Sequence, residues 1–373
     1  MIFLDNAGTT KMFSECVATY SHFACDEFYN PSAVSRKSAF VHAKLEEVRR
    51  DCLKKLGALK GTVIFTGGAT ESNNLAIKGA VKNGDYEYVF SNGEHPSVFN
   101  IARSLENDGK VVRFVGLDKN GKVNLDELRN MLNKKTKLIS CMLVSNEMGA
   151  INDVKQIVAL RNELAPNALV HIDAVQGFMK IPFSVEDLGV DMLSFSAHKF
   201  HGPKGVGGLY VRSLQLIKNI IDGGGQEYGL RSGTENVPGV MAMQTALLKI
   251  DVKENFKKVS RLKQIFNDIV ATENGIKILD FHGSPYIEVL LFSGVKGETM
   301  LHALEENGVI VGLGSACSAK KAGNRILENI GYSKEEIISS CRISFNAYMN
   351  ESEVREAGKI IIETYIEMLK RLN

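Results

Sequence analysis

The sequence predicts an α/β protein with a large domain on a mostly parallel sheet and a smaller α+β domain. Between residues 62 and 211, apolar runs of strand length alternate with segments of helical periodicity. The runs are rich in Val, Ile and Leu and nearly continuous, as in parallel strands that helices cover on both faces. After Gly223–Gly225 this alternation stops, and a long helical stretch is followed by separate strands and helices.

The domain boundary is placed near residue 255, within a helical stretch predicted from Val237 to about Val270. A length of 373 residues suits two domains. We assign residues 15–255 to the large domain, and residues 1–14 with 256–373 to the small domain.

Periodicity and cap residues predict the individual elements. In residues 33–56, apolar side chains recur every three or four positions, which is typical of an amphipathic helix, and Gly57 ends it. Asn124, with Glu127 three residues later, predicts a capping box at the start of another helix. The strands expected in the large domain are 62–66, 87–91, 111–117, 137–145, 169–173, 192–196 and 207–211. The small domain is expected to hold strands 277–281, 287–292 and 343–345 and helices 298–306, 335–340 and 352–372.

Composition excludes several classes of function. The net charge of +2 offers no basic surface for nucleic acid or for a membrane. The six cysteines are scattered, with no spacing typical of a disulfide framework or a zinc site, so no metal is expected. No signal peptide and no membrane-spanning run is found. We therefore expect a cytoplasmic protein in a reducing compartment.

Lys199 is a candidate Schiff-base lysine. It lies just beyond the predicted strand 192–196, in a loop rich in Gly and Pro. The chemistry requires an amine that is held rigidly and has a lowered pKa. By itself, Lys199 is better explained as an ordinary surface lysine, so the case depends on other residues.

Two further strand ends carry residues that suit one cofactor. The turn from Gly67 to Ser72 leads from a strand into a helix, where backbone N–H groups and the helix dipole favour a phosphate. Asp173 ends another buried strand, where a carboxylate can pair with a protonated ring nitrogen, and Gln176 follows it closely. Taken singly, the Gly67–Ser72 turn can serve simply to connect a strand with a helix, and Asp173 can serve simply as a helix cap.

His95 and Asn146 follow two more strands, and they complete the set. His95 can place an imidazole over a ring face, and Asn146 offers an amide to a ring hydroxyl. Because the ends of parallel strands meet at one edge of a sheet, we expect these groups to face a single pyridoxal phosphate.

With these residues in place, the chain resembles the cysteine desulfurases. These enzymes belong to the aminotransferase class V group of fold-type I, aspartate-aminotransferase-like pyridoxal phosphate enzymes. The motif Ser194–Lys204, which holds Lys199, is shared by the fold group, whereas Gly314-Ser-Ala-Cys317-Ser318 marks the desulfurases. The resemblance runs nearly end to end and includes Leu4–Ala7, Tyr29–Ser32, Phe65–Asn74, Glu94–Pro96, Asn146–Gly149, Asp173–Gln176, Arg231–Asn236 and Arg342–Ser344.

This resemblance implies a role for each matched residue. Lys199 forms the Schiff base and removes the substrate proton, Asp173 pairs with the pyridinium, and His95 stacks on the ring. The other residues implied to bind the cofactor are Ala69, Thr70, Asn146, Gln176, Ser196, His198 and, from the partner subunit of a homodimer, Thr234. Asn30 and Arg342 are implied to bind the carboxylate of L-cysteine, and Arg342 also suits that task as a guanidinium.

Cys317 is implied to be the second catalytic group. Its surroundings are small and polar, and Lys320 and Lys321 favour a thiolate. The family reaction removes sulfur from L-cysteine, which leaves L-alanine and a persulfide on Cys317. The sulfur then passes to an acceptor protein, either for iron–sulfur cluster assembly or for tRNA thiolation.

Three other functions stay open at this point. A selenocysteine lyase or a class V aminotransferase would use the same fold, and a sulfur-carrying protein without catalysis would need only Cys317. Longer relatives carry a further C-terminal segment that helps to dock an iron–sulfur scaffold, so the acceptor is not predicted. Gly312-Leu313 stands where Ser-Ser is common in the family, a change that we expect to be tolerated.

Overall fold

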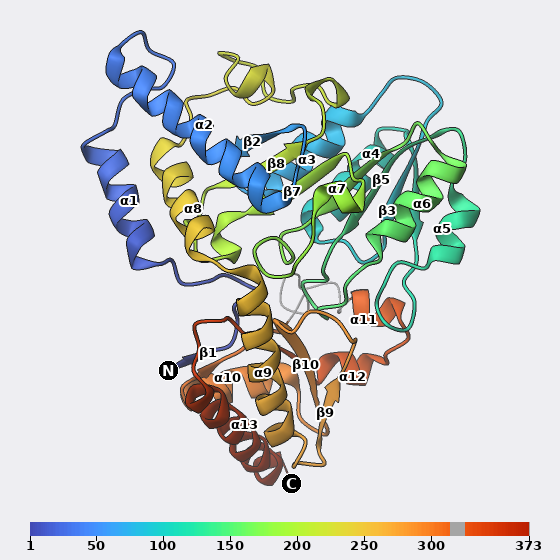
Figure 1. The fold of residues 1–373 in the computed structure, drawn as a ribbon. Helices are drawn as coiled ribbons and strands as arrows, with labels where there is room; N and C mark the ends of the chain where they lie inside the picture. Colours follow the sequence, from blue (N-terminus) through green and yellow to red (C-terminus); the bar gives the residue numbers. More distant parts are fainter. Residues whose placement is uncertain (314–324, 373) are drawn as a thin grey trace.

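The computed structural model describes residues 1–313 and 325–372, and its centre is a seven-stranded sheet (Figure 1). The strand order is β2-β8-β7-β6-β5-β3-β4. The strands are β2 (Thr62–Thr66), β3 (Glu87–Ser91), β4 (Val111–Val115), β5 (Thr136–Met142), β6 (Leu169–Asp173), β7 (Met192–Ser196) and β8 (Gly207–Val211). Each predicted strand of the large domain is therefore present, with ends that differ by at most a few residues.

The sheet is mostly parallel, which confirms the predicted fold class. Strands β4, β3, β5, β6 and β7 pair in parallel, whereas β8 runs antiparallel to both β7 and β2. The short connection from β7 to β8 explains the reversal, because a parallel crossover needs a dozen or more residues. Lys199 lies in this connection, at the carboxyl edge of the sheet.

Both faces of the sheet are buried because neighbouring strand residues belong to different cores. Val63 packs in one apolar cluster and Ile64 in another, and Val89 and Phe90 are divided in the same way. Helices α2 (Arg36–Leu56), α6 (Val154–Leu164) and α8 (Val237–Lys249) contribute to the first cluster. Helices α3 (Ala69–Ala80) and α4 (Pro96–Asn107) contribute to the second.

The predicted caps are partly confirmed. Gly57 ends α2 in the left-handed conformation, with φ of 63°. Asn124 caps α5 (Leu125–Met131) by accepting the N–H of Glu127. The carboxylate of Glu127 instead accepts the N–H of Gly116 over 2.9 Å, so the predicted capping box is wrong.

This part of the molecule also contains two further helices and three short 3-10 helices. They are α1 (Ser14–Cys25), α7 (Val185–Leu188), η1 (Ala197–Lys199), η2 (Leu214–Leu216) and η3 (Glu227–Gly229).

The single helical stretch predicted from Val237 to Val270 is wrong. The structure has two helices there, α8 and α9 (Val252–Val270), separated at Ile250 and Asp251. Asp251 has an extended backbone and accepts the N–H groups of Lys253 and Glu254, which starts a new helix. Helix α9 then runs from the large sheet into the lower part of the molecule (Figure 1).

The lower part contains a three-stranded antiparallel sheet of order β12-β10-β9, covered by helices. Its elements are β9 (Ile276–Leu279), β10 (Ile287–Phe292), α10 (Gly297–Glu306), α11 (Arg325–Asn329), α12 (Lys334–Ile338), β12 (Ser340–Ser344) and α13 (Glu351–Leu372). The helix predicted over 335–340 is therefore shorter, because Ser340 already belongs to β12. Phe256 packs against the cores of both parts, so the domain boundary proposed near residue 255 falls where the two cores meet.

The N-terminal segment connects the small sheet with the large one. Strand β1 (Ile2–Phe3) pairs with β11 (Val309–Ile310), and Ala7 N–H donates to Ser344 Oγ over 2.8 Å. Thr10 N–H then donates to the carbonyl of His198 over 2.9 Å. Residues 4–10 therefore cross from one part to the other beside Lys199. Across residues 1–313 and 325–372, no helix is both long and apolar enough to cross a membrane.

Candidate active site

A cavity of about 1110 Å³ lies at the carboxyl edge of the large sheet and extends to β12. Ten residues predicted from the sequence line it: Ala69, Thr70, His95, Asn146, Asp173, Gln176, Ser196, His198, Lys199 and Arg342. Asn30 and Thr234 are exposed and do not line the cavity within this chain. Cys317 lies outside the described residues.

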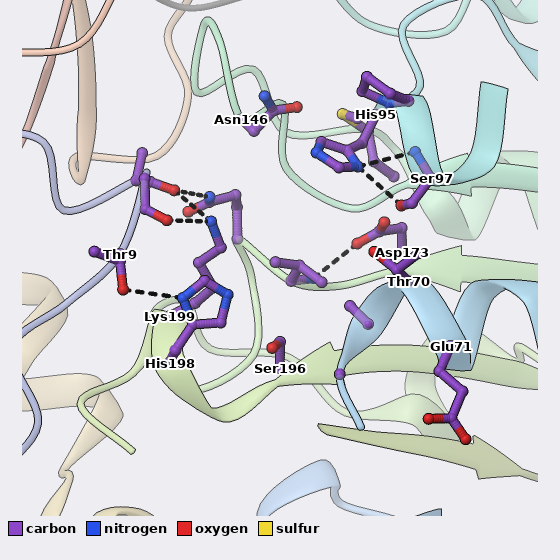
Figure 2. A pocket seen from close by; sticks show the side chains of 18 of the residues that line it. Thr9, Thr70, Glu71, His95, Ser97, Asn146, Asp173, Ser196, His198 and Lys199 are labelled. Carbon is purple, nitrogen blue, oxygen red and sulfur yellow. Dashed lines mark hydrogen bonds between the residues drawn. The ribbon is translucent and has the colours of Figure 1, made fainter. Parts of the chain in front are cut away.

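Lys199 occupies one side of this cavity, facing His95 and Asp173 (Figure 2). Its Nζ donates hydrogen bonds to the carbonyls of Ala7 and Gly8 over 2.8 and 2.7 Å. Burial and, to a smaller extent, the nearby charge of Arg342 lower the pKa of Lys199 to about 8, against the opposing effect of Asp5 and Asp173. An amine with this pKa is partly neutral near pH 8, as a nucleophile or base requires.

The turn between β2 and α3 has the backbone geometry that suits an anion. Gly68 has φ of 146°, and its side-chain-free backbone precedes the first turn of the twelve-residue helix α3. A Cβ added at Gly207, on the neighbouring strand, would lie 2.8 Å from the Gly68 backbone, so glycine allows the close approach. The free N–H groups at this helix start suit the phosphate of a cofactor, as predicted for Ala69 and Thr70.

Asp173 and His95 are held by one hydrogen-bond network. Asn73 Nδ2 donates to Asp173 Oδ2 and to Ser97 Oγ, each over 2.9 Å. Ser97 Oγ also lies 2.8 Å from His95 Nδ1, which accepts the Ser97 N–H as well. The second oxygen of Asp173 accepts the N–H of Val175 over 3.0 Å. The carboxylate, at the end of β6, and the imidazole, which follows β3, are thus oriented toward the same space from the two sides of β5 (Figure 2).

This network also favours a neutral His95. Burial lowers the pKa of His95, Asp173 raises it and Lys199 lowers it again. Because Nδ1 accepts from Ser97, a neutral ring carries its proton on Nε2. An uncharged imidazole can stack on an aromatic ring without repelling a cationic ring nitrogen beside Asp173.

Two amide side chains reach the cavity from other strand ends. Asn146 follows β5, and its buried Oδ1 has no hydrogen-bond partner among the described residues. Gln176 Nε2 donates to the carbonyl of Ala7 over 2.9 Å, and its Oε1 accepts from Lys180 Nζ over 2.7 Å. A buried acceptor without a partner is costly, so the Asn146 amide suits a polar ligand in the cavity.

The connection after β7 supplies the remaining polar groups. His198 Nδ1 lies 3.0 Å from Thr9 Oγ1. Burial lowers the pKa of His198 to about 4, and the charge of Lys199 adds to this effect, so the ring is neutral at pH 7. Ser196 and His198 line the same cavity as Ala69 and Thr70 of the α3 turn, and their contact with the cofactor stays a prediction.

Arg342 forms the opposite wall, from β12 of the small sheet. Its Nη1 donates to the carbonyl of Asn146 over 2.8 Å, and its Nη2 lies 2.7 Å from Asp5 Oδ1. Its Nε is buried and has no partner in the described part of the chain. The guanidinium is therefore held in a fixed orientation in the cavity wall, where its charge suits an anionic ligand.

The cavity fits pyridoxal phosphate on these observations. It combines a helix start for the phosphate, a buried carboxylate for the ring nitrogen, an amine of lowered pKa and an amide without a partner. No group of three or more His, Cys, Asp or Glu suited to a metal is found among residues 1–313 and 325–372. The groups present are those of an organic cofactor with an anionic end.

Several contributing residues were not predicted. Asn73 and Ser97 orient Asp173 and His95, Asp5 orients Arg342, and Lys180 contacts Gln176. Asn73 and Asp5 lie within motifs that the sequence does contain, Phe65–Asn74 and Leu4–Ala7. Their places in these motifs were the available signal, but their contacts depend on tertiary structure.

Known proteins resemble this chain over nearly its full length. The family model for aminotransferase class-V matches residues 2–356. The chain is 39% identical over 333 residues to a "NifS/IcsS protein homolog" of Lactobacillus delbrueckii subsp. bulgaricus, covering 86% of each chain. It is 34% identical over 383 residues to "Cysteine desulfurase IscS" of Dictyoglomus turgidum, covering 100% of this chain and 96% of the relative.

Solved structures share the fold. A "NIFS-LIKE PROTEIN" superposes with a TM-score of 0.91 at 31% identity, covering 99% of both chains. "SspA in complex with cysteine" superposes with a TM-score of 0.82 at 28% identity, covering 94% of this chain and 100% of that one. These likenesses confirm the predicted fold and the predicted resemblance to cysteine desulfurases. The chain belongs to the aminotransferase class-V family of pyridoxal phosphate-dependent enzymes.

Proposed function

We propose that this chain is a cysteine desulfurase that converts L-cysteine to L-alanine and retains the sulfur as a persulfide on Cys317. The observation that carries the proposal is the placement of Lys199, with its lowered pKa, between Asp173 and the guanidinium of Arg342 in one cavity. The full-length relatives that are named as cysteine desulfurases support the same reaction.

Arg342 binds the substrate carboxylate in this proposal. Its side chain lines the cavity, and its Nη1 and Nη2 are oriented by Asn146 and Asp5. A guanidinium that is already oriented loses little freedom when it binds a carboxylate. Cysteine would thereby be held with its Cα toward Lys199. Asn30 would have to approach from outside the cavity to share this task.

Lys199 moves the proton at Cα. Pyridoxal phosphate, when bound, supplies the electron sink that makes loss of this proton possible. Asp173 would hold the ring nitrogen, and His95 and Asn146 would hold the ring face and ring oxygen. The neutral fraction of the Lys199 amine is what permits it to act as a base near pH 8.

Cys317 takes the sulfur. Its thiolate attacks the sulfur atom of the substrate, so that an S–S bond forms while the bond between Cβ and sulfur breaks. The electron pair of the broken bond stays with the three-carbon fragment, which is protonated and leaves as L-alanine. The net change consumes one L-cysteine and one Cys317 thiol, and it produces one L-alanine and one persulfide.

The protein also needs partners. We infer a homodimer in which Thr234 of one chain reaches the cofactor of the other, because Thr234 is exposed and lies away from its own cavity. An acceptor protein must then take the persulfide sulfur for iron–sulfur assembly or tRNA thiolation.

The compartment proposed for the protein is a reducing cytoplasm. The five described cysteines are free thiols, as that compartment would keep them.

Mass spectrometry after brief exposure to L-cysteine tests the proposal. We expect an added sulfur atom on the peptide that contains Cys317, and release of L-alanine in equal amount. Cys317→Ser should still bind L-cysteine, seen as a change in the visible absorbance of the cofactor, but release no sulfide when a reductant is added.

Cys25→Ser is the matched control, since Cys25 is an exposed cysteine far from the cavity. It should keep the activity of the unmodified protein. A persulfide found mainly on another cysteine would overturn the assignment to Cys317. Full activity of Cys317→Ser would instead indicate an aminotransferase.

A further inference from the structure

Lys180 is a second buried amine beside the cavity, and the proposed reaction gives it no task. It lies in the turn that follows β6 and Asp173, and only 5% of its surface is exposed. Its Nζ donates to Gln176 Oε1 over 2.7 Å and lies 5.7 Å from the centre of the Tyr286 ring. Burial of a lysine without a carboxylate partner is costly, so its retention at this place calls for an explanation.

A chain of hydrogen bonds links Lys180 to Lys199. Lys180 donates to Gln176 Oε1, Gln176 Nε2 donates to the carbonyl of Ala7, and that carbonyl also accepts from Lys199 Nζ. A carbonyl can only accept, and a lysine nitrogen carries N–H groups in both of its protonation states. The Gln176 amide therefore has one orientation that satisfies both neighbours.

We propose that Lys180 is a positioning residue that locks the Gln176 amide with an N–H, not the carbonyl oxygen, toward the cofactor ring. Gln176 lines the cavity, and one hydrogen of its Nε2 remains after the bond to Ala7. That N–H is available to a negatively charged ring oxygen. The inference rests on the proposed function in that Gln176 is taken to contact the ring oxygen of pyridoxal phosphate.

The backbone of this turn supports a specific role. Met179, directly before Lys180, has φ of 61°, which is uncommon for a residue with a side chain. The N–H groups of Lys180 and Ile181 both donate to the carbonyl of Gly177, which holds the turn in place. The turn aims the Lys180 side chain back toward Gln176.

The charged groups around Lys180 are cationic. Burial and, to a smaller extent, the charges of Lys199 and Arg342 lower the pKa of Lys180 to about 7. His198 and His201 both feel the Lys180 charge, and burial keeps each of them neutral at pH 7. Tyr286 supplies an aromatic face and no anion. Removal of Lys180 therefore changes both the amide orientation and the local charge, and a test must separate the two.

A double-mutant cycle separates the effect of the Gln176 amide orientation from the effect of the local charge. Lys180→Met, Gln176→Leu and the double variant are loaded with pyridoxal phosphate, and the visible absorbance of each is titrated with pH without L-cysteine. In Lys180→Met the Gln176 amide can turn its oxygen toward the ring, so the ring oxygen loses one charge-assisted hydrogen bond. We therefore expect the pH at the midpoint of the absorbance titration to rise by about one unit. In the Gln176→Leu background only the change in local charge remains, so Lys180→Met should add a much smaller shift.

Two results would overturn the proposal. One is an unchanged titration midpoint in Lys180→Met. The other is a Lys180→Met shift of equal size in the unmodified protein and in Gln176→Leu, which would show that Lys180 acts by charge alone. Lys180→Gln keeps an N–H donor without the charge, and its midpoint should lie closer to that of the unmodified protein. If the midpoint of Lys180→Gln shifted as far as that of Lys180→Met, this result would also contradict the proposal that Lys180 orients the Gln176 amide.

Lys263→Met is the matched control. Lys263 is a partly buried lysine beside Glu288 in the small sheet, so its loss tests for a general effect of removing such a lysine. It should leave the midpoint unchanged. Because the titration is made without substrate, its outcome does not depend on Cys317, whereas failure of the proposed function would appear as absent sulfide release with an intact titration.

Discussion

One wall of the cavity is built from strand ends of a single sheet, whereas the opposite wall joins the two ends of the chain. On the first wall, Asn73 ties Asp173 to Ser97 and thereby to His95, within the large sheet and its helices. On the second wall, Arg342 is paired with Asp5, 337 positions away in the sequence. The cofactor chemistry therefore depends on one rigid layer, while the substrate contact depends on how two parts of the molecule meet.

Because of this difference, changes on the first wall should affect the rate of chemistry. Changes on the second should affect the binding of L-cysteine. The four variants below test that division, beginning with the largest expected effect.

Lys199→Ala should abolish turnover, with a loss of at least about 10⁴-fold, because both the cofactor linkage and the base are removed. Sulfide release from L-cysteine measures the effect. Lys155→Ala, at an exposed position of α6, is the control and should retain full activity. Substantial activity in Lys199→Ala would remove Lys199 from the reaction.

Asp173→Asn should slow proton removal at Cα by about 10²–10³-fold, the cost of losing one oriented charge in a catalytic site. Deuterium exchange at Cα of L-alanine measures this step without sulfur chemistry. The variant should also bind pyridoxal phosphate more weakly. Asp187→Asn, at an exposed position, should exchange at the normal rate, and normal exchange in Asp173→Asn would contradict the assigned role.

Arg342→Lys should raise KM for L-cysteine by about 10- to 100-fold, the range expected for one hydrogen bond to a charged group. A lysine cannot contact Asn146, Asp5 and a carboxylate at once. Steady-state kinetics should show a smaller change in kcat than in KM. Arg355→Lys, on the exposed face of α13, should change neither, and an effect on kcat alone would place Arg342 with the first wall.

Gly312→Ala should raise KM a few-fold and leave kcat unchanged. A Cβ at Gly312 would lie 2.7 Å from Asp5 Oδ1 and 3.0 Å from Arg342 Nη2, so the ion pair must shift. A thermal melt should show little loss of stability, and an unchanged KM would show that the pair adjusts without cost.

Local patterns predicted most of the large sheet. Each strand run is apolar and ends at a turn signal, and the polar groups that follow these strands meet because parallel strands share a carboxyl edge. Lys199, Asp173, His95 and Asn146 were found in this way. The break between α8 and α9 was missed because apolar periodicity continues across Ile250, and only the cap at Asp251 shows that a new helix begins.

Contacts between distant segments could not be predicted from such patterns. Nothing near Asn73 shows that its amide bridges Asp173 and Ser97, and nothing near Asp5 shows that it faces Arg342. Asn30 and Thr234 were assigned by motif alone, and within this chain they lie outside the cavity. Both roles stay predictions, and that of Thr234 needs a second subunit.

The sequence by itself determined the fold class, the family and the residues at the strand ends, because periodicity, turn chemistry and motifs are local properties. Only the tertiary structure decided how those residues are oriented. The single orientation of the Gln176 amide between Lys180 and Ala7 is the clearest case. It follows from two segments that meet in space, the turn after β6 and the N-terminal segment, and a side chain's rotamer is set by the neighbours it packs against.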